Sequence, residues 1–198
     1  MDPKPLTDHR ARILRAAVEV YSECGFRGAT TRRIAQKADV NEVTLFRHFG
    51  SKASLLREAI ECQGFEIHFQ HLPEIPRHPR EELLDWCSRH MEELRARRSL
   101  IRTCMGEIEE HPEILPAGSP TIQAARVLAE YLKRLQSRGL ARSDFDPALA
   151  APMLMGILFA DAMGRDIMPD LYPGTAANAL EQYVTLFLRS IGAAGDTP

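Results

Sequence analysis

The sequence has little that is typical of a secreted or membrane protein. Its only cysteines are Cys24, Cys62, Cys87 and Cys104. They share no C-x-x-C spacing, and no apolar signal segment opens the chain. The longest uncharged run, residues 147–160, is too short to cross a bilayer and contains Pro152. We therefore expect a cytoplasmic protein with free thiols and no membrane contact.

Strand patterns, fixed-period repeats and low-complexity segments are also absent. Helical patterns run through the chain instead, and the first, at residues 8–24, has one apolar face. That face consists of Ile13, Ala16, Ala17, Val20, Tyr21 and Cys24. With 198 residues, of which 44% are hydrophobic, the chain can form one medium domain or two small ones. We predict an all-α fold.

Charge of one sign does not dominate the chain, whose 25 Lys and Arg and 27 Asp and Glu give a net charge of −2. The distribution is uneven, however. Residues 1–63 hold 11 basic and 8 acidic residues, a net +3, which leaves 14 basic and 19 acidic residues, a net −5, for the remainder. A mildly basic head on an acidic body suits binding to a polyanion.

Two short helices separated by a turn follow the first helical segment. Thr30 or Thr31 can cap the first of them, and Asn41 can cap the second, which ends at Gly50. These dimensions match a helix-turn-helix, whose second helix lies in the DNA major groove. The residues that can join a core are Ile34, Ala35, Val40, Leu45 and Phe49, and those left outside are Glu42, Val43, Thr44, Arg47 and His48.

Two stretches carry a specific resemblance, "RARILRAAVEVYSECGFRGATT" at residues 10–31 and "ATTRRIAQKADVNEVTLFRHFGSKASLL" at residues 29–56. They resemble the first helix and the DNA-binding head of the tetracycline-repressor (TetR) family. The resemblance covers about the first third of the chain. It implies an N-terminal three-helix head, residues 1–55, and a C-terminal helical bundle for ligand binding and dimerisation, residues 56–198. The helix from Ser51 links the two.

The same resemblance implies the roles of individual residues in DNA binding. Thr30 and Thr31 lie where the family grips phosphate, residues 41–48 form the recognition helix, and His48 and Lys52 match phosphate-contact positions. The predicted DNA contacts are Thr30, Thr31, Arg32, Asn41, Glu42, Val43, Thr44, Phe46, Arg47, His48 and Lys52.

The head departs from the family pattern at a few positions. Asp39 stands where glycine is common in the turn, and Phe46 replaces a tyrosine whose hydroxyl would bind phosphate. Glu42 replaces a frequent lysine and can accept from cytosine N4, while Val43 replaces a small residue and can meet a thymine methyl group.

The second domain is expected to hold a ligand cavity, although the same residues can form an ordinary helix-bundle core. The candidate lining residues are Trp86, His90, Met91, Met105, Tyr131, Met155 and Phe159. The run at residues 147–160 is apolar around its whole circumference, which in a small domain requires a partner chain to cover it. The candidate dimer-interface residues are Gly156, Ala160, Tyr183 and Phe187.

We expect no cofactor and no metal. The nearest approach to a metal-binding cluster is Glu66, His68, His71 and His78, and no cysteine or carboxylate completes a familiar spacing there. No nucleophile–base pair or phosphate loop indicates an enzyme.

These observations together predict a homodimeric, ligand-responsive transcription regulator. We expect a repressor that binds a double-stranded, pseudo-palindromic operator and is released by a small hydrophobic effector. Two alternatives stay open at this point. One is a helical-bundle enzyme that uses the acidic cluster Glu107, Glu109, Glu110 and His111. The other is a DNA-architectural protein that binds no ligand.

Overall fold

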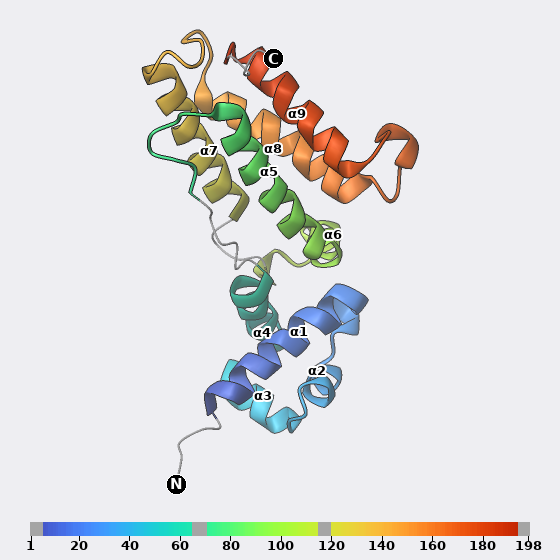
Figure 1. The fold of residues 1–198 in the computed structure, drawn as a ribbon. Helices are drawn as coiled ribbons and strands as arrows, with labels where there is room; N and C mark the ends of the chain where they lie inside the picture. The colour runs from blue at the N-terminus through green and yellow to red at the C-terminus, as the bar shows by residue number, and fades with distance from the viewer. Residues whose placement is uncertain (1–5, 65–70, 115–119, 194–198) are drawn as a thin grey trace. The chain divides into compact units, whose positions relative to one another are not determined.

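The computed structural model describes residues 6–64, 71–114 and 120–193 (Figure 1). Within these residues every regular element is a helix or a single helical turn, so the predicted all-α fold is confirmed. The described chain forms two compact units. Unit 1 comprises residues 6–64 and 97–114, and unit 2 comprises residues 71–96 and 120–193.

Unit 1 begins with four helices, α1 (Leu6–Gly28), α2 (Thr31–Lys37), α3 (Glu42–Phe49) and α4 (Lys52–Ala59), and α4 continues into a π-helical turn, Ile60–Gly64. The predicted caps are confirmed. The Thr30 hydroxyl accepts from the Arg33 N–H at 3.3 Å, and the side-chain Oδ1 of Asn41 accepts from the Val43 N–H at 2.9 Å. The Ser51 hydroxyl accepts from the Ser54 N–H at 3.1 Å. Each cap satisfies an N–H that the helix itself leaves unpaired.

The core of unit 1 explains why so short a helix as α3 is stable. Leu45 and Phe49 of α3 pack with the buried face of α1 and with Ile34 of α2, and Leu45 is fully buried. An isolated helix of this length is marginal in water, so this burial supplies the stability that the backbone lacks.

Helix α6 (Arg98–Glu107) also belongs to unit 1, together with a 3₁₀ turn at Pro112–Ile114. It packs against α1 and adds Leu100 and Cys104 to the common core. Met105 of α6, a candidate lining residue, is 56% exposed. Both α4 and α6 therefore group with the first helices, and this grouping does not follow the predicted boundary at residue 55. That boundary separates DNA binding from ligand binding and dimerisation, and it stays a prediction.

Unit 2 is a helical bundle of α5 (Pro79–Ala96), α7 (Pro120–Ser137), α8 (Pro147–Gly164) and α9 (Ala176–Ser190), with a 3₁₀ turn at Pro169–Leu171. Helix α8 packs against α5, α7 and α9 (Figure 1). Asp146 caps α8 and Thr175 caps α9. The largest side chains of this core that are almost completely buried are Leu83, Met91, Leu128 and Tyr131.

Candidate DNA-binding surface

The turn between α2 and α3 depends on a residue in a left-handed conformation. Asp39 has a φ of 52°, a region that residues with a Cβ rarely adopt and that a short polar side chain tolerates best after glycine. This conformation explains why a glycine is common at this position in the family that the sequence resembles. The Val40 N–H then donates to the Ala35 carbonyl at 3.0 Å and closes the turn.

Helix α3 divides its residues between a buried and an open face, as predicted. Leu45 and Phe49 lie inside, whereas Val43 is 72% exposed and Phe46 is 47% exposed. Arg47 is also exposed, and Thr44 and His48 are half-buried. The open face therefore offers a guanidinium and two apolar side chains, which suits contact with base edges and thymine methyl groups.

Thr31 and Glu42, which the sequence assigns to separate DNA contacts, bind each other in the structure. The hydroxyl of Thr31, the first residue of α2, donates a hydrogen bond to Oε1 of Glu42, the first residue of α3. A threonine hydroxyl has a single proton, so Thr31 cannot also donate to a phosphate while this bond persists. The pair therefore ties the two helix starts together.

Lys52 also has a partner within the protein. Its Nζ donates to the Phe26 carbonyl at 2.6 Å and lies 3.9 Å from the centroid of the Phe26 ring. Partial burial lowers the pKa of Lys52, and the negative charge of Glu107 opposes this effect. An ammonium group has three donors, so the bond to Phe26 leaves two for a phosphate.

His48 presents only part of its ring toward solvent. Its Nε2 is buried and has no hydrogen-bond partner among the residues that the structure describes. A DNA contact through Nε2 would therefore require rotation of the side chain. The ring lies beside Phe49, with 6.0 Å between the centroids, and Phe49 in turn lies under the guanidinium of Arg10 at 5.0 Å.

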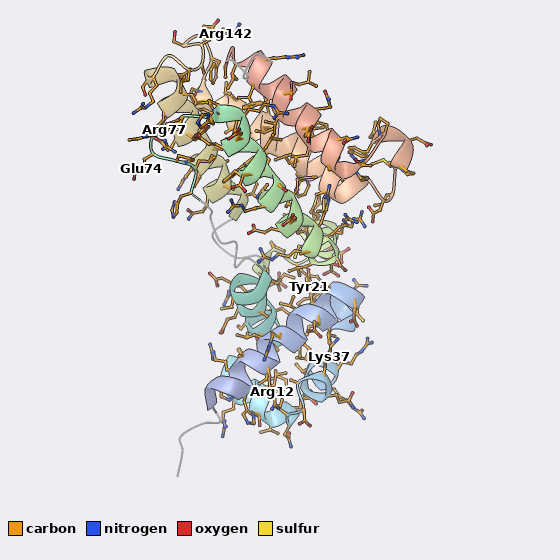
Figure 2. The ribbon with its side chains drawn as sticks, viewed as in Figure 1. Arg12, Tyr21, Lys37, Glu74, Arg77 and Arg142 are labelled. Atoms are coloured by element: carbon orange, nitrogen blue, oxygen red, sulfur yellow. The ribbon has the colours of Figure 1, made fainter. Side chains whose placement is uncertain are left out.

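Arg12, whose role was not predicted, connects α1 to the turn of the helix-turn-helix (Figure 2). Its Nη2 donates to the carbonyls of Ala38 at 2.8 Å and Asp39 at 2.9 Å, and its Nε donates to Ala38 at 3.2 Å. These carbonyls end α2 and lack partners of their own within the helix. No local pattern indicates such a contact, because 26 residues separate Arg12 from Ala38.

Known proteins share this arrangement. Residues 13–59, from the first half of α1 to the end of α4, match the sequence profile of the bacterial regulatory proteins of the tetR family. The matched part of the chain is a TetR-family DNA-binding domain. The resemblance noted in the sequence is thereby confirmed, and so is the architecture of a helix-turn-helix head with a helical C-terminal part.

Relatives extend the similarity over most of this TetR-family chain. The HTH-type transcriptional regulator YvkB of Bacillus subtilis is 28% identical over 184 residues, which cover 92% of this chain and 96% of YvkB. The class A tetracycline repressor of Escherichia coli is 34% identical over 61 residues, 31% of this chain and 28% of that repressor. A TetR-family regulator from Mesorhizobium loti matches with a TM-score of 0.71 and 21% identity, over 93% of this chain and 96% of the other. The chain is therefore a DNA-binding transcriptional regulator and not an enzyme.

The residues that the sequence places around a ligand lie mostly in unit 2 of this TetR-family regulator. Trp86, His90, Met91, Tyr131 and Met155 are buried, and Phe159 is half-buried. The rings of Trp86 and His90 are stacked, with 5.3 Å between their centroids and 12° between their planes. Burial lowers the pKa of His90 to about 4, so its ring is neutral near pH 7. The Tyr131 hydroxyl donates to Oε2 of Glu82 at 2.6 Å.

Met105 is the exception among these lining candidates. It lies on α6 in unit 1, and its side chain is more than half exposed, because α6 turns Leu100 and Cys104 toward α1 instead. Its place in a ligand cavity stays a prediction.

Within unit 2, helix α8 is buried on one face only, and its cover by a partner chain stays a prediction. Its open face carries Leu149 at 70% exposure, Met153 at 68% and Ile157 at 37%, beside the exposed Gly156. Leu186 of α9 is 59% exposed. By length and composition alone α8 could cross a membrane, and half of it is buried within unit 2.

The other three interface candidates are turned inward to different degrees. Ala160 is half-buried, and Phe187 is only 7% exposed and belongs to the core of unit 2. The Tyr183 hydroxyl donates to Oδ2 of Asp161 at 2.9 Å. Gly156 is thus the candidate with the most open surroundings.

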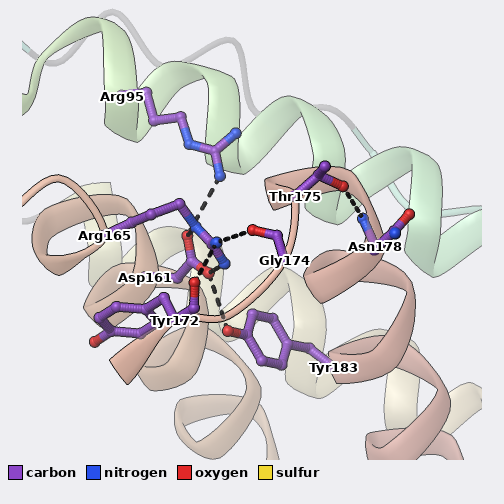
Figure 3. A network of polar contacts seen from close by, with 8 residues as sticks. All are labelled: Arg95, Asp161, Arg165, Tyr172, Gly174, Thr175, Asn178 and Tyr183. Carbon is purple, nitrogen blue, oxygen red and sulfur yellow. Dashed lines mark hydrogen bonds and ion pairs between the residues drawn. The ribbon is translucent and has the colours of Figure 1, made fainter. Parts of the chain in front are cut away.

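Asp161 is a fully buried carboxylate that sequence reasoning missed (Figure 3). Arg165, one turn later on α8, donates to it from Nε at 2.9 Å and from Nη2 at 2.5 Å, and Arg95 of α5 lies at 3.4 Å. Burial would raise the pKa of Asp161, but the hydrogen bonds from Arg165 and Tyr183 and the charge of the arginines outweigh it and lower the pKa. Arg165 also donates to the carbonyls of Tyr172 and Gly174, so the group fixes the connection between α8 and α9.

The described residues contain no group of three His, Cys, Asp or Glu side chains that could hold a metal ion. Of the four metal candidates, Glu66 and His68 lie outside the described residues, and His71 and His78 are exposed. Cys24, Cys87 and Cys104 are free thiols.

Proposed function

We propose that this regulator is a cytoplasmic repressor that binds a pseudo-palindromic operator as a homodimer and releases it when a small hydrophobic effector binds. Residues 1–55 contact DNA, and residues 56–198 hold the effector and form the dimer. The observation that carries the proposal is the open face of α3, on which Val43, Phe46 and Arg47 are all exposed. The capped starts of α2 and α4, with Thr30 and Ser51, support phosphate binding beside it.

Dimerisation follows from the requirements of such an operator. Two recognition helices must lie about 34–36 Å apart to enter successive major grooves on one face of the DNA. The exposed apolar face of α8, at Leu149, Met153 and Gly156, supplies a surface that a second copy can cover.

The experiment that tests DNA recognition is selection of bound sites from random DNA with the purified protein, followed by binding measurements with variants. Arg47→Ala is expected to lose about 1–3 kcal/mol and to relax the preference at one base pair per half-site. Lys52→Ala is expected to weaken binding to all sequences and to flatten the salt dependence by about one counterion per head. Arg126→Ala, which removes an exposed arginine of α7, is the matched control. Operator binding by the Arg47 and Lys52 variants that equals wild type would contradict the proposal.

Effector release separates a ligand-responsive repressor from an architectural protein that binds no ligand. The stacked pair of Trp86 and His90, with the buried Met91, provides apolar and aromatic surface with one polar group, which favours a largely hydrophobic organic effector. Apolar compounds are screened for release of the selected operator, and each active compound is repeated with Trp86→Ala. A compound that acts through this site loses its effect in the variant. Absence of any releasing compound would favour the architectural alternative.

A further inference from the structure

Helix α1 is interrupted near its end, at Gly25, whose φ of 67° and ψ of −175° are not helical. In an uninterrupted helix the Phe26 N–H would donate to the carbonyl of Ser22, four residues earlier. With the observed ψ at Gly25, that N–H points away from the helix axis. The interruption therefore leaves a backbone donor at Phe26 and a backbone acceptor at Ser22 that need other partners.

Helix α6 supplies partners for both groups. The carboxylate of Glu107 accepts from the Phe26 N–H at 2.8 Å and 2.9 Å. The hydroxyls of Ser99 and Thr103 donate to the Ser22 carbonyl at 3.1 Å and 3.2 Å. Ser99, Thr103 and Glu107 are spaced by four residues and so form one row along α6, which we call the α6 polar row. The row replaces the backbone hydrogen bond that α1 lacks.

The approach of Glu107 to α1 is possible only because residue 25 is a glycine. A Cβ at Gly25 would lie 2.4 Å from Oε1 of Glu107, well inside contact distance. Its positive φ also favours glycine. The interruption of α1 and the position of the Glu107 carboxylate therefore depend on the same residue.

Phe26 is held from its other side as well. Its carbonyl accepts from Lys52 at the start of α4, and its ring lies 3.8 Å from the ring of His111, centroid to centroid. The backbone then leads within four residues to Thr30, the cap of α2, and the Ala29 N–H returns to the Gly25 carbonyl at 3.0 Å. The segment from Gly25 to Ala29 is thus fixed on the side of α6 and on the side of α4.

We propose that Glu107 is a positioning residue for DNA binding. It holds the α1–α2 connection, and through it the start of α2, in the geometry that DNA recognition requires. The inference rests on the proposed function, since it concerns the surface that the operator meets. It also gives a role to a residue that the sequence suggested only as part of an acidic cluster.

Loss of Glu107 as a positioning residue and loss of its negative charge change DNA binding in opposite directions, so the two roles can be distinguished. Removing a carboxylate near a DNA-binding head favours DNA binding if only long-range charge matters, because DNA is a polyanion. A positioning residue has the opposite effect, because its loss disorders the head. Glu109, an exposed acid two residues further along, provides the matched charge control.

The test compares Glu107→Ala, Glu107→Gln and Glu109→Gln on operator sites selected with the wild-type protein, at a temperature where circular dichroism shows each variant to be folded. We expect Glu107→Ala to weaken operator binding by about tenfold or more. Glu107→Gln should lie between Glu107→Ala and wild type, because its amide oxygen still accepts one hydrogen bond. Glu109→Gln should bind at least as tightly as wild type. In the free protein, hydrogen exchange at the Phe26 amide should be faster in Glu107→Ala and unchanged in Glu109→Gln.

Two results would overturn the inference while leaving the proposed function intact. One is wild-type operator affinity in folded Glu107→Ala, and the other is unchanged exchange at the Phe26 amide. A contact that only stabilises the fold would lower the melting temperature without changing operator affinity, and this also counts against the inference. Failure of the wild-type protein to select any DNA site would overturn the proposed function and this inference with it.

Discussion

Arg12 and Asp39 lie on different elements, yet the guanidinium of Arg12 donates to the backbone carbonyl of Asp39 at 2.9 Å. The same guanidinium binds the carbonyl of Ala38 at 2.8 Å. Asp39 is the residue that gives the turn its left-handed conformation. The first helix therefore holds the end of α2 at the point where the chain turns into the recognition helix.

The first prediction concerns this contact. Arg12→Met keeps most of the aliphatic stem and removes the donors, so two carbonyls lose a charged partner. We expect the free energy of unfolding to fall by about 1–3 kcal/mol. Urea unfolding measures this change. Arg15→Met, at an exposed position of the same helix, is the control and should change stability by less than about 0.5 kcal/mol. Equal effects of the two substitutions would mean that the hydrogen bonds of Arg12 contribute nothing.

The second prediction concerns the backbone of Asp39. Its side chain is fully exposed and its carboxylate lies 3.9 Å from Arg12, so the ion pair contributes little. What matters is the φ of 52°. Asp39→Gly and Asp39→Asn should therefore change the free energy of unfolding by less than about 0.5 kcal/mol, whereas Asp39→Val should cost about 1–2 kcal/mol. Thermal unfolding of the three variants provides the comparison, and a valine variant as stable as wild type would contradict the conformational argument.

The third prediction concerns assembly through α8. A Cβ at Gly156 has nothing within 4 Å, so a larger side chain fits the isolated protomer. Gly156→Leu should leave the helical content unchanged and raise the dimer dissociation constant by about tenfold or more, because it holds the two packed helices apart. Sedimentation equilibrium and circular dichroism measure the two quantities.

Gly106 supplies the control for this experiment. It also lies in a helix with open space around it, and Gly106→Leu should not change assembly. A wild-type protein that is monomeric at micromolar concentration would remove the basis of the dimer proposal.

The fourth prediction concerns pH. Burial lowers the pKa of His90 from 6.5 to about 4, so the native state keeps the ring neutral while the unfolded chain takes up a proton below about pH 6.5. The unfolded state thus binds more protons between pH 6.5 and 4, and the free energy of unfolding falls as the pH is lowered through this window. The loss from His90 alone is at most about 1.4 kcal/mol per pH unit.

Substitution isolates the contribution of His90. His90→Phe keeps a ring beside Trp86 and cannot titrate, so its stability should fall less between pH 6.5 and 4 than that of wild type. His71→Gln removes an exposed histidine and should follow the wild-type curve. Parallel curves for wild type and His90→Phe in urea unfolding would show that His90 is not kept neutral by burial.

Local sequence signals were sufficient for much of the fold. Thr30 and Asn41 were predicted as caps and cap their helices, because capping depends on residues only two or three positions apart. The inward face of α3, with Leu45 and Phe49, likewise follows from helical periodicity. The open face of α3 was predictable for the same reason.

Other parts of the candidate site depend on contacts that no local pattern contains. The sequence placed Thr31 and Glu42 in separate DNA contacts, but the turn brings their side chains into one hydrogen bond. Met105 was predicted to line a ligand cavity, but the packing of α6 on α1 leaves that side chain exposed. Helical spacing shows which residues share a face. Only the packing of a neighbouring helix decides which face is buried.

The amino-acid sequence by itself determined the helices, their caps and the family of this protein, because these depend on residue types at short fixed spacings. The tertiary structure decided which polar groups satisfy one another across long separations. Glu107 meets the Phe26 N–H across 81 residues, and Arg95 meets the buried Asp161 across 66. A buried charge or an unpaired backbone group must find a partner, but only the packing of the helices determines which one it finds.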